Sequence, residues 1–202
     1  CLAALPVGIT PIVRVCTGAL DEGTRILDNG AHGIVVPHMN TPAFAKQVAD
    51  AFRFVPQGHR SWGGGTAVYG FQGPGMAEAQ AEINANIMVG GAIETEEAVR
   101  NVDAIAATPG IDFLLIGTSD LTADMGISGQ IGHARVQEAY RKVIDACRKH
   151  GKFSGFGGVY EEQWLKAYAE MGATMIYGGN DQAFLMAGAT QRAKFLRDVT
   201  KK

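Results

Sequence analysis

Short apolar runs alternate with segments of helical spacing along most of the chain, and this alternation restricts the possible folds more than any other feature. The apolar runs are rich in β-branched residues and lie at 11–15, 33–36, 87–93, 112–116, 153–157 and 174–177. A run that is apolar throughout, such as Phe113-Leu114-Leu115-Ile116, is typical of a parallel strand covered on both faces. Parallel strands need crossovers between them, so the alternation predicts an α/β fold.

Helix start signals lie between the apolar runs. Helices are predicted over 41–52, 95–107, 134–150 and 160–171. Thr41 can cap the first of them with Pro42 at the first helical position, and Thr95 can cap the second. Six strand–helix units have the spacing of a (β/α)8 TIM barrel, which usually takes about 250 residues and needs two more units to close. We predict one TIM-barrel domain over 1–202, with a doubly wound open sheet as the alternative.

Composition argues against several classes of protein. Hydrophobic residues make up 47% of the 202 residues, which allows a sizeable core, and the net charge of −2 without a basic run argues against nucleic acid as a partner. Cys1, Cys16 and Cys147 form no CxxC pair, which favours a reducing cytoplasm over a disulfide framework. No apolar run approaches the roughly 20 residues that span a bilayer, so a membrane protein is not expected.

A glycine-rich segment over 56–80 interrupts the alternation. It also contains Trp62, Tyr69 and Phe71, and we expect Trp62 and Tyr69 to be exposed. Loops of this length are uncommon in compact domains, and ordered ones often serve as binding loops or active-site lids. The alternative is a mobile excursion without a role.

Two carboxylates come shortly after predicted strands. Glu94 follows the run 87–93, and Asp120 lies just past 112–116. Residues at the carboxyl ends of barrel strands converge on one face, and a hard cation such as Mg²⁺ or Mn²⁺ prefers a few carboxylates with its other positions left to water and substrate. Taken singly, each has a simpler explanation, Glu94 as a first-turn helix acid and Asp120 as a loop or capping residue.

Arg14 lies inside an apolar strand, where an unpaired guanidinium would be costly to bury. It should therefore meet an anion at the barrel mouth, either a substrate carboxylate or an internal acidic residue. Of the histidines, His38 and His59 could reach such a site, but no HxxxH or HxH pair suggests zinc. The sequence also lacks the GxxxxGK[ST] phosphate loop and the GxSxG nucleophile elbow.

Three motifs in the chain resemble the HpcH/HpaI aldolases, metal-dependent class II enzymes that include hydroxy-oxo-acid aldolases and a macrophomate-synthase-like branch. The motifs cover 11–15, 27–37 and 93–121, and the third is the most specific. The similarity extends along nearly the whole chain, including 146–152 and 179–181.

The resemblance implies that Glu94 and Asp120 are the ligands of a divalent cation, which would be Mg²⁺, Mn²⁺ or Co²⁺. It implies that Arg14 is catalytic and contacts a 2-oxo acid such as pyruvate or oxaloacetate, and that main-chain amides near Ser119 and Asp120 hold the carboxylate of this acid. The implied reaction is the reversible cleavage of a 4-hydroxy-2-oxo acid to pyruvate and an aldehyde through a metal-stabilised enolate. A homo-oligomer, a hexamer in that family, is implied as well.

One part of the family's machinery is absent. The family's catalytic histidine lies in an Asp-Gly-Glu-His-like segment upstream of the position of Arg14, and aligned with the family the six strands are strands three to eight. We therefore expect the first two strand–helix units to precede Cys1, and His38 or His59 would otherwise be candidates for a substitute base. The alternatives are oxaloacetate decarboxylation, a citrate-lyase-like or malyl-CoA-lyase-like cleavage, and a non-catalytic barrel fragment or pseudoenzyme that binds 2-oxo acids.

Overall fold

The computed structural model describes residues 1–64 and 66–200, and a parallel six-stranded sheet lies at its centre. The strands are β1 (Ile12–Arg14), β2 (Gly33–Val36), β3 (Met88–Ile93), β4 (Phe113–Gly117), β5 (Phe153–Gly157) and β6 (Met175–Ile176). They lie side by side in chain order, and every neighbouring pair is parallel. All six carboxyl ends therefore lie at the same edge of the sheet.

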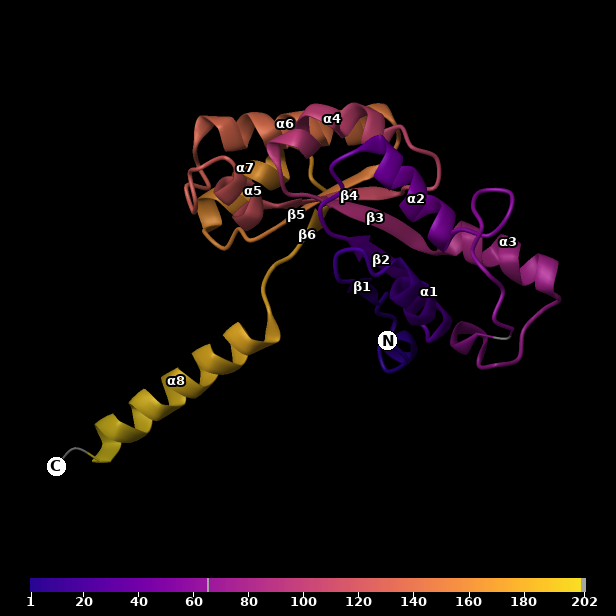
Figure 1. The fold of residues 1–202 in the computed structure, drawn as a ribbon. Coiled ribbons are helices and arrows are strands. Elements are labelled where there is room, and N and C mark those ends of the chain that lie inside the picture. The colour runs from indigo at the N-terminus through magenta and orange to yellow at the C-terminus, as the bar shows by residue number, and fades with distance from the viewer. Residues whose placement is uncertain (65, 201–202) are drawn as a thin grey trace.

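The sheet is curled into a half-barrel with helices along its outer face (Figure 1). A doubly wound sheet reverses its strand order at a switch point, and this sheet has no reversal. The doubly wound alternative is therefore wrong. The six predicted strands are confirmed, and no strand end differs from its predicted position by more than one residue.

Eight α-helices and two short 3-10 turns occur in the described part of the chain. The helices are α1 (Leu20–Asp28), α2 (Pro42–Phe52), α3 (Met76–Asn86), α4 (Glu96–Ala106), α5 (Thr118–Asp124), α6 (Ala134–Lys149), α7 (Glu162–Glu170) and α8 (Asp181–Thr200), and the 3-10 turns are η1 (Leu5–Val7) and η2 (Ala67–Tyr69). Both predicted caps are present, since Thr41 Oγ1 accepts from the N–H of Phe44 at 3.1 Å and Thr95 Oγ1 from that of Ala98 at 3.1 Å. None of these helices is long and apolar enough to cross a membrane.

Side chains alternate between the two faces of the sheet. The large core lies between the outer face of the sheet and the helices, and from β4 it includes Leu114 and Ile116. The inner face of the curl carries a smaller cluster that includes Ala92, Phe113 and Leu115 with Ile12 packed against it. Because the strand period is two, residues two positions after Ile12 and Ala92 also face the inside of the curl. These residues are Arg14 and Glu94.

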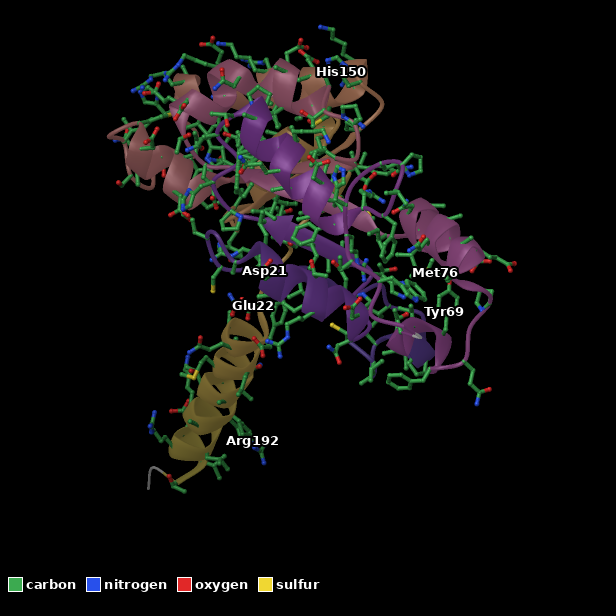
Figure 2. All side chains as sticks on the ribbon, turned by 45° about the vertical axis from the view of Figure 1, so that its right-hand side comes forward. Asp21, Glu22, Tyr69, Met76, His150 and Arg192 are labelled. Carbon is green, nitrogen blue, oxygen red and sulfur yellow. The ribbon has the colours of Figure 1, made fainter. Side chains whose placement is uncertain are left out.

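The segment 56–80 is more ordered than predicted. Helix α3 begins at Met76, so the expectation of a loop throughout this segment is wrong at its end. Trp62 packs edge-on against Phe54 with ring centroids 5.7 Å apart, and the Tyr69 hydroxyl donates to Glu82 at 2.7 Å. Both aromatic side chains are half-buried rather than exposed, because their rings contact the core (Figure 2 labels Tyr69 and Met76).

Helix α8 does not pack against the half-barrel. It has no buried residue and extends away from the other elements (Figure 1). Its exposed large apolar side chains are Phe184, Leu185, Met186, Phe195, Leu196 and Val199. Arg192, labelled on this helix in Figure 2, lies over the Phe195 ring, with Cζ 5.1 Å from the ring centroid.

Candidate active site

A hollow of about 320 Å³ at the carboxyl edge of the sheet contains all four residues predicted to form the site. Arg14 ends β1, Glu94 follows β3, and Ser119 and Asp120 lie in the first turn of α5. The other lining residues are Ala92, Leu115, Gly117, Thr118, Gly157, Gly158, Tyr160 and Tyr177. The parallel sheet thus brings together the four predicted residues, which are up to 106 positions apart in the chain, from 14 to 120.

Glu94 is a buried carboxylate with only 3% of its surface exposed. Its Oε2 accepts a hydrogen bond from the main-chain N–H of His38 at 2.9 Å and lies 3.2 Å from Nδ1 of the same residue. A Cβ added at Gly117 would lie only 2.7 Å from Oε1, so the glycine makes room for this carboxylate. No described residue hydrogen-bonds to Oε1, which leaves this oxygen available to a ligand.

The two histidines proposed as substitute bases lie in different places. His38 contacts Glu94, and its φ of 52° is rare for a residue with a side chain. His59 Nδ1 lies 3.7 Å from Asp50 Oδ1, near the C-terminal end of α2 and hence at the opposite edge of the sheet. The suggestion that His59 reaches the site is therefore wrong. His38 reaches the site by its contact with Glu94.

The turn that carries Ser119 and Asp120 is anchored by the residue before it. Thr118 is buried, and its Oγ1 donates to the carbonyl of Gly157 at 2.7 Å. The same oxygen lies 2.6 Å from the Tyr140 hydroxyl, which donates to it because the single Thr118 proton is already used. Burial raises the pKa of Tyr140, so this phenol stays protonated. Thr118 thus holds the start of α5 against the end of β5, whereas Ser119 and Asp120 are exposed at the hollow.

Arg14 lies in a strand as predicted, but it is the last residue of β1 and is exposed, so the expectation that its guanidinium is buried is wrong. Among the described residues, no acidic side chain forms an ion pair with Arg14. The alternative that Arg14 pairs with an internal acidic residue is therefore not supported by the described residues. A guanidinium that faces the inside of the curl beside two carboxylates can bind an anion there.

Tyr160 and Tyr177 line the hollow but were not predicted from the sequence. Their only signal is position, since Tyr160 comes three residues after β5 and Tyr177 directly after β6. The glycines at 117, 157 and 158 were also missed. A Cβ at Gly158 would lie 2.8 Å from Ser119 Oγ, so this glycine permits the close approach of the α5 turn.

A sequence model of the HpcH/HpaI aldolase/citrate lyase family matches residues 1–187. The chain belongs to this family. It is 36% identical over 199 residues to a 4-hydroxy-4-methyl-2-oxoglutarate aldolase of Hapsidospora irregularis and 36% identical over 194 residues to a 5-keto-4-deoxy-D-glucarate aldolase of Shigella sonnei. Each alignment covers 95% of this chain and 72% of the relative.

A solved structure shows the same architecture. The HpcH/HpaI aldolase from Desulfitobacterium hafniense superposes with a TM-score of 0.85 at 29% identity, over 99% of this chain and 76% of that one. The family predicted from the three motifs is confirmed. The chain is therefore a member of an enzyme family, and its named relatives are aldolases, which are carbon–carbon lyases.

The donor groups of the hollow fit the divalent cation that the family implies. Glu94 and Asp120 are its two acidic lining residues, and Glu94 Oε1 is free of other partners in the described residues. Within residues 1–64 and 66–200, no group of three or more His, Cys, Asp and Glu side chains could hold a metal ion. Two carboxylates suit a hard cation that completes its coordination with water and substrate oxygens.

Proposed function

We propose that the protein is a divalent-metal-dependent aldolase that reversibly cleaves 4-hydroxy-2-oxo acids to pyruvate and an aldehyde. The observation that carries this proposal is the meeting of Arg14, Glu94, Ser119 and Asp120 in one hollow at the carboxyl ends of parallel strands. Membership of the HpcH/HpaI family and two aldolases at 36% identity support the reaction class.

In this proposal Glu94 and Asp120 hold Mg²⁺, Mn²⁺ or Co²⁺. The cation, when bound, supplies Lewis-acid stabilisation of the negative charge that develops as pyruvate loses a methyl proton. Glu94 is suited to this role because His38 occupies Oε2 and leaves Oε1 toward the hollow. Asp120 is suited because it is exposed at the hollow and has no ion-pair partner among the described residues.

Arg14 and the α5 turn bind the 2-oxo acid. The guanidinium of Arg14 offers several N–H donors and a fixed positive charge to its oxygens. The main-chain amides near Ser119 and Asp120 receive the carboxylate, because amides in a first helical turn have no partner within the helix. The anionic substrate is thereby held between two donor groups, one at the end of β1 and one in the first turn of α5.

We further propose that the half-barrel belongs to a single (β/α)8 barrel in which the six strands are strands three to eight. Their uninterrupted parallel order and the curl of the sheet support this. Among the described residues, His38 is the candidate for the general base, because its Nδ1 lies 3.2 Å from Glu94 Oε2. A homo-oligomer, hexameric by resemblance, is supported by the exposed apolar side chains of α8.

A calorimetric titration with Mn²⁺ and oxalate, which mimics the pyruvate enolate, tests the metal site. Wild-type protein should bind oxalate only with Mn²⁺, and Glu94→Ala or Asp120→Ala should abolish this binding. Glu97→Ala is the matched control, because Glu97 is exposed on α4 outside the hollow and should leave binding unchanged.

The reaction itself is tested by metal-dependent pyruvate release from 4-hydroxy-2-oxo acids and by exchange of pyruvate methyl protons in D2O. Both should occur with Mn²⁺ and stop after chelation. If the protein releases pyruvate from oxaloacetate but not from any 4-hydroxy-2-oxo acid, the decarboxylase alternative is favoured. Absence of both reactions and of oxalate binding would refute the proposal and favour a non-catalytic protein.

A further inference from the structure

Tyr177 lines the same hollow as Arg14 and Glu94, although none of the roles above uses it. It follows β6 directly, and its main-chain N–H donates to the carbonyl of Phe156 on β5 at 3.0 Å. A Cβ added at Gly157 would lie 2.9 Å from Cδ2 of Tyr177. The ring is therefore seated against the bare backbone of Gly157, which limits its movement at the edge of the hollow.

The hydroxyl of Tyr177 is available to a ligand. No described residue hydrogen-bonds to it, and 45% of the residue's surface is exposed. Burial raises the pKa of Tyr177, and the positive charge of Arg14 opposes this rise, which places the two groups within electrostatic reach of each other. A tyrosine hydroxyl with its ordinary pKa of about 10 is already protonated at neutral pH, and a raised pKa does not change this, so the hydroxyl can donate a hydrogen bond.

The position of Tyr177 in the sheet indicates which part of a substrate it meets. The proposed cation ligands follow β3 and β4, whereas Tyr177 follows β6, two strands beyond β4. Neighbouring strands lie about 4.8 Å apart, so the main chain at Tyr177 is roughly 10 Å from that at the end of β4. We place the second substrate, the aldehyde, in the part of the hollow that Tyr177 lines, next to the 2-oxo acid that Asp120 and Arg14 hold.

We propose that Tyr177 is a further active-site residue whose hydroxyl donates a hydrogen bond to the oxygen of the aldehyde. This inference rests on the proposed aldolase function. During addition, the electron pair at the enolate carbon forms a bond to the aldehyde carbon, and the carbonyl π pair moves onto the aldehyde oxygen. Tyr177 stabilises the charge on this oxygen, which then takes a proton from water and becomes the 4-hydroxyl group; cleavage runs through the same steps in reverse.

Removal of one hydroxyl tests this role. In Tyr177→Phe, cleavage of 4-hydroxy-2-oxopentanoate should fall about 100-fold in kcat, as expected for the loss of one donor to a developing oxyanion. Exchange of pyruvate methyl protons and Mn²⁺-dependent oxalate affinity should stay within about twofold of wild type, because neither involves the aldehyde. Tyr69→Phe is the matched control: its hydroxyl bonds Glu82 beside the amino ends of the strands, and its loss should leave all three readouts unchanged.

Two results would overturn the inference. In one, Tyr177→Phe cleaves the substrate as fast as wild type. In the other, proton exchange and oxalate affinity fall in parallel with cleavage, which would indicate a general disturbance of the site. A failure of the proposed aldolase function can be distinguished from a failure of the Tyr177 role. In the first case the wild-type protein shows neither proton exchange nor oxalate binding, and the inference about Tyr177 is refuted as well.

Discussion

Gly117 controls how Glu94 presents its carboxylate to the hollow. A Cβ at this position would lie 2.6 Å from Glu94 Cγ and 2.7 Å from Oε1, so one of the two residues would have to move. We predict that Gly117→Ala weakens Mn²⁺-dependent oxalate binding at least tenfold in calorimetry. Gly188→Ala on α8, where an added Cβ meets nothing within 4 Å, should leave the affinity unchanged. Equal affinities for the two variants would contradict this account of Gly117.

His38 positions Glu94 through its main chain as well as its ring. The left-handed φ of 52° directs the N–H at Glu94 Oε2, and glycine adopts this conformation without the cost that alanine pays, about 1 kcal/mol. We predict that His38→Gly unfolds in urea at a higher concentration than His38→Ala and keeps Mn²⁺-dependent oxalate binding. If His38→Gly instead loses this binding as fully as Glu94→Ala, the imidazole rather than the amide orients the carboxylate.

At the scale of elements, α5 is joined to β5 by one buried hydroxyl. Thr118→Val removes the bond to Gly157 and leaves the Tyr140 hydroxyl without its partner, which should lower the free energy of unfolding by about 2 kcal/mol. Thr118→Ser keeps both hydrogen bonds and loses a methyl group, which costs about 0.8 kcal/mol. Urea denaturation of the two variants measures the difference, and equal losses would show that the methyl group matters more than the hydroxyl.

All six strands of the described chain and four of its helices, α2, α4, α6 and α7, were predictable, because their signals are local. Thr41 and Thr95 cap the helices that they were predicted to cap, and the apolar run 112–116 becomes β4. Helix α3 was missed because the glycines before it resemble a continuing loop. The short helix α5 was missed because Thr118 and Ser119 read as part of a turn.

At the scale of the whole molecule, α8 is the helix that buries none of its residues against the half-barrel. Helical spacing places Leu185 and Leu196 on one side and Thr190 on the opposite side. If this side contacts a second copy of the chain, Leu185→Glu combined with Leu196→Glu should reduce the mass measured by light scattering to that of a monomer. Thr190→Glu, which adds a charge on the other side, should keep the oligomer. A monomeric wild-type protein would contradict the proposed homo-oligomer.

The sequence by itself determined the parallel α/β class, the family and the four residues Arg14, Glu94, Ser119 and Asp120 as candidates. Apolar periodicity, capping residues and motifs carry this information within short stretches of chain. Only the tertiary structure decided which other groups share the hollow, because the curl of the sheet brings the ends of β1 and β6 to the same space. Tyr177 is one of these groups, and nothing in its neighbouring residues indicates that its ring lies near Arg14.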